Sequence, residues 1–118
     1  MKEIRSLLIV FLLPSIVFAG GFNIISNGKS GWGHYDEQSG NYYIYYEDGS
    51  YIDGHISPSG HFRQMDNRNN VSIGYYDRES GNFYIDGEYG VIEDSGNYYK
   101  YDGDELTEHG VIIWDQRN

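Results

Sequence analysis

Tyrosine dominates the chemistry that this chain could do. The sequence holds 13 tyrosines, four histidines and no cysteine, and two segments, residues 40–46 (GNYYIYY) and 96–101 (GNYYKY), concentrate the tyrosines. Side chains alternate between the two faces of a strand. If Tyr42 and Tyr98 point inward, an outward aromatic stripe remains. We predict its members as ligand-binding residues, because exposed aromatic patches mark binding surfaces: Tyr43, Tyr45, Tyr99 and Tyr101.

Two structural explanations compete with binding. Both faces of each tyrosine-rich strand could be buried between stacked hairpins, or the rows could be cross-strand ladders that stabilise a sheet. The exposure of the four outward tyrosines separates these explanations from a binding surface. Fluorescence of the folded chain with candidate ligands would separate them further.

The other reactive residues do not assemble a catalytic or metal-binding set. Without cysteine there is neither a thiol nucleophile nor a thiolate site. A zinc or copper site needs three or four converging ligands, and we expect His55 and His61, which flank one turn, to lie on different faces. No acidic stretch fits the twelve-residue calcium loop. We therefore predict no catalytic residue, no metal, no cofactor and no enzyme activity.

The charge excludes one class of partner. The formal net charge is −10, and residues 1–19 contribute +1, so residues 20–118 carry −11. Only Arg63 and Arg68 lie close together among the later basic residues. Nucleic acids need clustered positive charge, so we expect no nucleic-acid partner.

The N-terminal 19 residues have the pattern of a secretory signal peptide. Lys2 and Arg5 precede an apolar run that ends in Val17-Phe18-Ala19, which is the order of such signals. The run is shorter than the ~20 residues of a spanning helix, and Pro14 interrupts it. We predict a signal peptide over 1–19, export to the periplasm or the medium, and no membrane span after cleavage.

Composition predicts an all-β fold for the remainder. Tyrosine, valine and isoleucine favour strands, glycine, asparagine and aspartate favour turns, and Leu106 is the only leucine after Ala19. We expect residues 20–31 to be an irregular N-terminal segment and residues 32–118 to form one β-hairpin domain.

The spacing of the glycines indicates an internal repeat. Unit-opening glycines recur about every 20 residues and, except for the last, are followed by a second glycine in a polar turn. The opening set is Gly33, Gly54, Gly74, Gly90 and Gly110, and the turn set is Gly40, Gly60, Gly81 and Gly96. Since single hairpins are marginally stable and stacked units bury each other's faces, we predict tandem ~20-residue hairpin repeats that form a meander, a solenoid or a flower-like module.

The same spacing predicts the core. A large apolar or aromatic residue stands two positions after each glycine, on one face of its strand. These core candidates are Tyr35, Ile56, Tyr76, Ile92, Ile112, Tyr42, Phe62, Phe83 and Tyr98.

Residues 40–56 (GNYYIYYEDGSYIDGHI) place glycine, aromatic run, Asp-Gly and glycine in an order that resembles the choline-binding and glucan-binding repeats of surface proteins. The resemblance covers most of residues 33–113, and other small β-repeat families such as the β-flower proteins are similar. It implies an aromatic cage shared by neighbouring repeats. One cage position would fall to Tyr42, Phe62, Phe83 and Tyr98. The tryptophan position is filled here by His34, His55, Tyr75, Val91 and Val111.

Two functions follow as expectations. The first is an exported, non-catalytic module that binds a glycan or a cell-envelope surface through its tyrosine stripe. The second is a structural or protein-interaction module without a small ligand, which pairs through exposed sheet edges.

Overall fold

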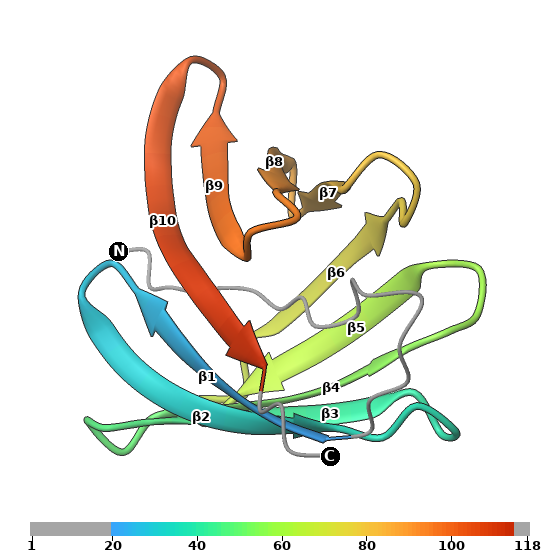
Figure 1. The fold of residues 1–118 in the computed structure, drawn as a ribbon, viewed down its shortest axis with the longest axis vertical. Coiled ribbons are helices and arrows are strands. Elements are labelled where there is room, and N and C mark those ends of the chain that lie inside the picture. Colours follow the sequence, from blue (N-terminus) through green and yellow to red (C-terminus); the bar gives the residue numbers. More distant parts are fainter. Residues whose placement is uncertain (1–19, 115–118) are drawn as a thin grey trace.

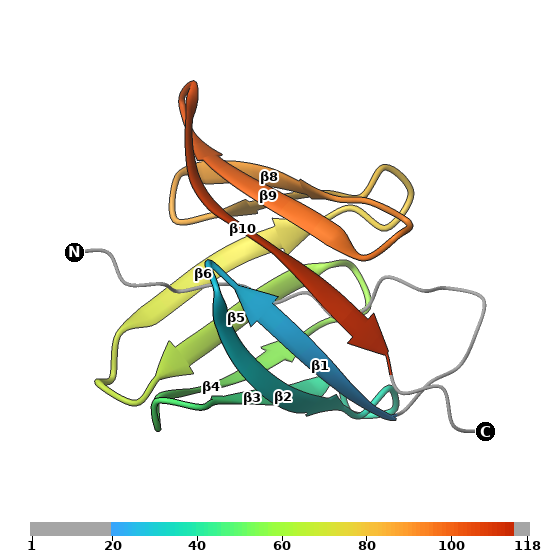
Figure 2. The same cartoon turned by 60° about the vertical axis from the view of Figure 1, so that its left-hand side comes forward.

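The structure, a computed structural model, describes residues 20–114, which form ten strands closed into one antiparallel barrel (Figures 1 and 2). The strands are β1 Gly20–Ser26, β2 Lys29–Tyr35, β3 Asn41–Tyr46, β4 Tyr51–Ile56, β5 His61–Asp66, β6 Val71–Tyr76, β7 Asn82–Ile85, β8 Glu88–Ile92, β9 Asn97–Asp102 and β10 Glu105–Trp114. Each strand pairs with its sequence neighbours. Among these residues no helix is long and apolar enough to cross a membrane. The predicted signal peptide lies outside them, as do residues 115–118.

The all-β prediction is confirmed, but the predicted meander or solenoid is wrong, because the sheet has no open edge. β10 lies beside β1 (Figure 2), and the register pairs Ile24 with Ile112. β1 pairs with β2 on its other side. All ten strands therefore have a neighbour on both sides, which is how barrels remove the edge-strand problem.

The strand that closes the barrel comes from residues 20–31, which we expected to be irregular. Instead they form β1, a turn and the start of β2. Phe22, Ile24 and Ser26 alternate into the interior. The turn is Asn27-Gly28, with φ of 51° and 84°. Asn-Gly between alternating residues is a strong hairpin signal, because both turn positions need positive φ.

The turns gather at two ends of the barrel. We call one end the mouth; its turns are residues 27–28, 47–50, 67–70, 86–87 and 103–104. We call the other end the base; its turns are residues 36–40, 57–60, 77–81 and 93–96. The base turns contain the four predicted turn glycines. In each case the glycine carbonyl accepts a bond from the backbone N–H of a core residue in a following strand, as Gly40 does from Ile56 at 2.9 Å.

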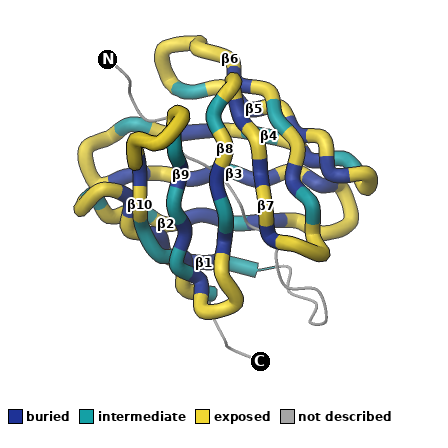
Figure 3. The backbone as a smooth tube through the Cα atoms, turned by 90° about the horizontal axis from the view of Figure 1, so that it is seen from above, coloured by how far each residue is buried: buried dark blue, intermediate teal, exposed yellow. Residues whose placement is uncertain are grey.

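The interior confirms the predicted core. All nine core candidates are buried, and burial alternates along the strands (Figure 3). Phe22, Ile24, Ile44, Ile52 and Ile85 join them, with Tyr46. Burying one such side chain is worth roughly 1.5–3 kcal/mol, so this filled interior is the main source of stability in a chain without disulfides.

Each unit-opening glycine lies opposite an aromatic ring of the neighbouring strand. Tyr42 pairs with Gly54, and its ring occupies the place where a Cβ on that glycine would stand. The same relation recurs in four more pairs: Phe22 with Gly33, Phe62 with Gly74, Phe83 with Gly90, and Tyr98 with Gly110. Because these glycines have no side chain, the aromatic ring of the neighbouring strand occupies that space inside the barrel. The glycine spacing therefore determines where the inward rings lie.

The mouth half of the interior also holds buried polar side chains. Ser26, Gln64, Ser72, Lys100 and Glu108 are buried there. The Tyr42 hydroxyl donates to Gln64 Oε1 at 2.7 Å. Buried polar groups are tolerated where they have partners.

Candidate binding surface

The four predicted tyrosines all face outward, but they lie on two separate parts of the barrel. Tyr43 and Tyr45 are on β3, whereas Tyr99 and Tyr101 are on β9. In the strand order β2, β1 and β10 separate these strands on one side. Tyr45 is 41% exposed, and the other three are half-buried. The inward orientation expected for Tyr42 and Tyr98 is confirmed. The single stripe expected from the sequence is therefore two surfaces.

The first surface is a cluster of five rings, which we call the aromatic face: Trp32, His34, Tyr43, Tyr45 and Tyr51. It covers the outer side of β2, β3 and β4. The register places Trp32 opposite Tyr45, and Tyr45 opposite Tyr51.

Ring contacts make the aromatic face continuous. The Trp32 ring centroid lies 5.4 Å from that of Tyr45, which lies 5.7 Å from that of Tyr51. Tyr43 contacts Trp32 edge-on at 5.9 Å and stacks with His34 at 6.0 Å. Such pairs are favourable beyond their buried area. The face stays open to solvent, because Trp32 is 53% exposed and Tyr51 37%.

The second surface is a row across β5 to β10. Its register runs through five strand pairs and joins His61, Tyr75, Tyr84, Tyr89, Tyr101 and Leu106. Tyr101 stacks on Tyr89 at 5.5 Å. We call these residues the second row. His61 also contacts Tyr75 at 5.0 Å, so two cross-strand ring pairs of this row form the kind of ladder that competes with binding.

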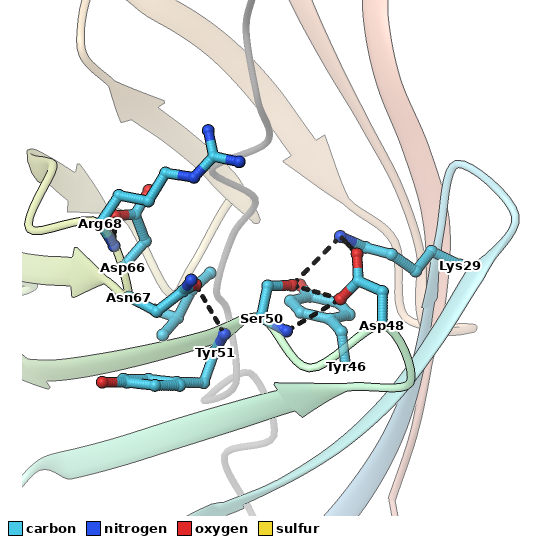
Figure 4. Close-up of a pocket in the computed structure, with 9 residues that line it drawn as sticks. Lys29, Tyr46, Asp48, Ser50, Tyr51, Asp66, Asn67 and Arg68 are labelled. Atoms are coloured by element: carbon cyan, nitrogen blue, oxygen red, sulfur yellow. Dashed lines mark hydrogen bonds and ion pairs between the residues drawn. The ribbon is translucent and has the colours of Figure 1, made fainter.

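A pocket of about 240 Å³ opens at the mouth beside the aromatic face (Figure 4). Its walls come from three segments: Lys29 at the start of β2, the β3–β4 turn with Asp48 and Ser50, and the β5–β6 turn. Tyr51 lines the pocket and also belongs to the aromatic face. The Tyr51 ring lies on the outer side of β4 and points away from Lys29 in Figure 4, so the aromatic face meets the pocket at the rim of the barrel.

One wall holds a compensated charge pair. Lys29 Nζ lies 3.2 Å from Asp48 Oδ2 and 4.3 Å from the centre of the Tyr46 ring. The Ser50 hydroxyl and backbone N–H donate to Asp48 at 2.6 and 2.9 Å. These hydrogen bonds, with a smaller contribution from Lys29, lower the pKa of Asp48 to about 2. Asp48 therefore stays charged in all but strong acid.

The opposite wall holds an uncompensated cation. The Asp66 carboxylate accepts hydrogen bonds from Arg68 N, Asn70 N and Asn70 Nδ2 at 2.8, 3.0 and 3.1 Å, so it is engaged in its own turn. The Arg68 guanidinium makes no ion pair or hydrogen bond with any side chain of residues 20–114. Figure 4 shows it reaching over the pocket from the side opposite Lys29.

Asn67 links the β5–β6 turn of the pocket to Tyr51 at the start of β4. Its Oδ1 accepts from Tyr51 N at 3.0 Å, and its backbone N–H donates to Tyr51 O at 3.1 Å. This reciprocal pair holds the β5–β6 turn against the start of β4, so the surface is preorganised.

Comparisons with protein-family models, with curated proteins and with solved structures find no match for this chain. The resemblance to choline-binding and glucan-binding repeats therefore stays a prediction. The residues that it assigns to one cage position, Tyr42, Phe62, Phe83 and Tyr98, are buried inside the barrel. The rings available to a ligand are others.

The histidines lie differently from the expectation. His55 and His61 are both exposed on the outer side, because Ile56 and Phe62, which follow them, are paired and both point inward. His55 Nδ1 bonds Asn41 Oδ1 at 3.0 Å, and His61 Nδ1 bonds Ser59 Oγ at 3.1 Å. Within residues 20–114, no three histidine or carboxylate side chains are grouped to hold a metal ion.

Sequence reasoning missed Trp32, Tyr51 and the pocket. Trp32 stands between Gly31 and Gly33, and its outward direction follows from the inward Tyr35 by strand alternation. That signal was present. The pocket had no local signal, since its walls come from separate turns.

Proposed function

We propose that this chain is an exported, non-catalytic module that binds a glycan or a glycan-bearing envelope surface on its aromatic face. The observation that carries the proposal is the continuous cluster of rings around Trp32, Tyr45 and Tyr51, which are 53%, 41% and 37% exposed. Sugar rings present apolar C–H faces that stack on such rings, and aromatic side chains combine large contact area with low conformational entropy.

The polar groups beside the rings support the same proposal. Binding sites combine an aromatic surface with a few fixed polar side chains that orient the ligand. Ser50, Asn67 and Arg68 line the pocket next to Tyr51, and Asn67 is held by its reciprocal bonds to that residue. Hydroxyl groups of a sugar are suitable partners for such side chains.

Tandem hairpin units of about 20 residues are part of this proposal. The recurring glycine–ring pair, of which Gly54 with Tyr42 is one example, supports descent from a duplicated hairpin. The duplicated units would then share their inward residues and differ in their outward residues. This difference accounts for the different composition of the aromatic face and the second row.

A protein partner is the second candidate, and the second row favours it. Tyr84, Tyr89 and Leu106 are 51%, 47% and 46% exposed, and exposed apolar rows of this kind occur at protein interfaces. Strand addition at a sheet edge is a poor mode here, since every strand of residues 20–114 is paired on both sides.

Intrinsic fluorescence tests the proposal. The chain has two tryptophans; Trp32 is exposed on the aromatic face, and Trp114 packs against the core. Titration with a panel of soluble glycans and cell-wall fragments should give a saturable change in emission for at least one member. Trp32→Phe should remove the change, and Tyr84→Ser on the second row should leave it intact. A folded protein that responds to no panel member would contradict glycan binding.

A further inference from the structure

The pocket at the mouth is lined by four charged side chains, and Arg68 is the one whose charged group makes no ion pair or hydrogen bond with a side chain of residues 20–114. Lys29 pairs with Asp48 at 3.2 Å. Asp66 accepts three hydrogen bonds from its own turn. Arg68 remains with an unengaged guanidinium among residues 20–114. A guanidinium presents five N–H donors and no acceptor, so the group that complements it is an anion.

A planar oxyanion fits this position best. Arginine binds carboxylates through two parallel hydrogen bonds, which gives geometric selectivity as well as affinity. Lys29 lies on the far side of the pocket (Figure 4), but Asp48 compensates its charge, so Arg68 supplies the cation. The pocket volume of about 240 Å³ exceeds what a bare carboxylate fills, and therefore leaves room for the ring that carries it.

The connection to the aromatic face identifies that ring. The row Trp32, Tyr45 and Tyr51 proceeds in steps of 5.4 and 5.7 Å between centroids, and its last member lines the pocket. A sugar chain lying along this row therefore ends at the rim of the pocket, and its next residue turns over the rim towards Arg68. The carboxylate that Arg68 would bind then belongs to a sugar of that chain.

The charge of the rest of the protein limits the ligand to few negative groups. Residues 20–118 carry −11, from the chain total of −10 less the +1 of residues 1–19. Asp48 and Asp66 flank the pocket. A polyanion would meet this negative field along its whole length. A single carboxylate placed at Arg68 meets the cation of the pocket that has no ion-pair partner among residues 20–114.

We infer that the mouth pocket is an acidic-sugar subsite, in which Arg68 binds the carboxylate of a uronic acid residue whose chain lies on the aromatic face. The inference rests on the proposed glycan binding and names its ligand class. Arg68 sets the preference for the acid, Tyr51 stacks on the neighbouring sugar at the rim, and Lys29 stays with Asp48 as a fixed wall of the pocket.

The test uses matched monosaccharides and the purified chain. Methyl glucoside, methyl glucuronide and methyl galacturonide are titrated separately, with acetate as a free carboxylate, and amide shifts are followed by heteronuclear NMR. Either uronide should shift amides of residues 47–50 and 67–70, with an affinity about tenfold or more above that of the glucoside, as expected for a bidentate charged contact. Binding by acetate alone would assign the pocket to small organic acids and overturn the sugar assignment.

Variants separate this inference from the proposed function. Arg68→Gln should abolish the preference for the uronide and leave glucoside shifts on the aromatic face unchanged. Arg68→Lys keeps the positive charge but loses the planar guanidinium that donates two parallel hydrogen bonds. It should therefore retain only part of the preference. Arg63→Gln is the matched control, because it removes an arginine of the outer side of β5, away from the pocket. Equal binding of uronide and glucoside, or a preference that survives Arg68→Gln, overturns the inference while glycan binding stands. Absence of any sugar shift overturns both.

Discussion

Lys100 Nζ lies 3.3 Å from Glu108 Oε1 inside the barrel, where both residues are buried. Glu108 Oε2 accepts hydrogen bonds from Ser26 Oγ and Tyr98 OH at 2.8 and 2.9 Å, and Lys100 also faces Glu88 at 3.5 Å. Charges taken out of water are tolerated only with partners of this kind. Loss of one partner leaves the other charge buried and uncompensated.

Lys100→Met should therefore lower the free energy of unfolding by about 3–5 kcal/mol, measured by urea denaturation. Lys29→Met is the control, since its pair with Asp48 is partly exposed and such pairs are worth about 1 kcal/mol or less. Equal losses in the two variants would show that Lys100 is solvated in solution.

The ring of Tyr42 over Gly54 gives a second prediction. Gly54→Ala places a methyl group where the ring stands, and overpacking of this kind costs about 1–3 kcal/mol. Gly20→Ala should be close to neutral, because no atom of the described residues 20–114 lies within 4 Å of its Cβ position. In a Tyr42→Ala background Gly54→Ala should cost about 1 kcal/mol less than in the native chain, since the two sites are in contact. Additive losses would contradict the contact.

Glycine spacing was sufficient to predict the core but not the closure. The residue two positions after each unit-opening or turn glycine points inward, as Tyr35 and Phe62 do. Strand alternation is a local rule and is sufficient to predict this. Whether a sheet closes depends on the tilt and stagger of all its strands. The pairing of Ile24 with Ile112 joins residues from opposite ends of the domain, and no local pattern specifies it.

The candidate surface was predictable only in part for the same reason. Strand alternation placed Tyr43 and Tyr99 outward, and they do lie on the outer side. Their grouping into one stripe followed from similar local sequence, whereas the barrel order separates β3 from β9. The pocket needs Lys29 beside the β3–β4 turn and opposite Arg68. These residues come from three separate segments, and the antiparallel order of β2 to β6 brings them together.

Buried tyrosines give a pH prediction. Burial raises the pKa of Tyr42 and of Tyr98 well above the ordinary value, and the charge of Glu108 adds to the shift of Tyr98. The folded state therefore keeps protons that the unfolded state releases, so their stabilising contribution is complete below about pH 10 and is lost as the pH rises above it. Urea denaturation across this range should show a steep fall in stability.

Tyr42→Phe tests the origin of that fall, because phenylalanine cannot ionise. The slope of unfolding free energy against pH above about pH 10 should become shallower by about 1.4 kcal/mol per pH unit. The variant also loses the bond to Gln64, which lowers stability at every pH and leaves the slope comparison intact. An unchanged slope would mean that Tyr42 ionises in the folded barrel.

The two tyrosine pairs decide which outer surface binds. Tyr43→Ser with Tyr45→Ser removes the centre of the aromatic face, where both rings contact Trp32. It should weaken binding of any glycan selected from the panel by about tenfold or more, which corresponds to a loss of about 1.4 kcal/mol or more. Tyr99→Ser with Tyr101→Ser removes half-buried rings of another part of the barrel, and should leave affinity within about twofold, because that pair lies outside the aromatic face.

Calorimetric titration measures the affinities, and urea denaturation shows that each double variant folds. Cross-strand ring contacts contribute about 0.2–1 kcal/mol each. The Tyr43 and Tyr45 variant loses contacts to Trp32, His34 and Tyr51 and should lose more stability than the other variant, which loses the contact of Tyr101 with Tyr89, but both should remain folded. The opposite result, with affinity lost in the Tyr99 and Tyr101 variant alone, would move the glycan site to β9. Loss in both variants would require one ligand to span surfaces that β2, β1 and β10 separate, and would therefore indicate a long chain wrapped around the barrel.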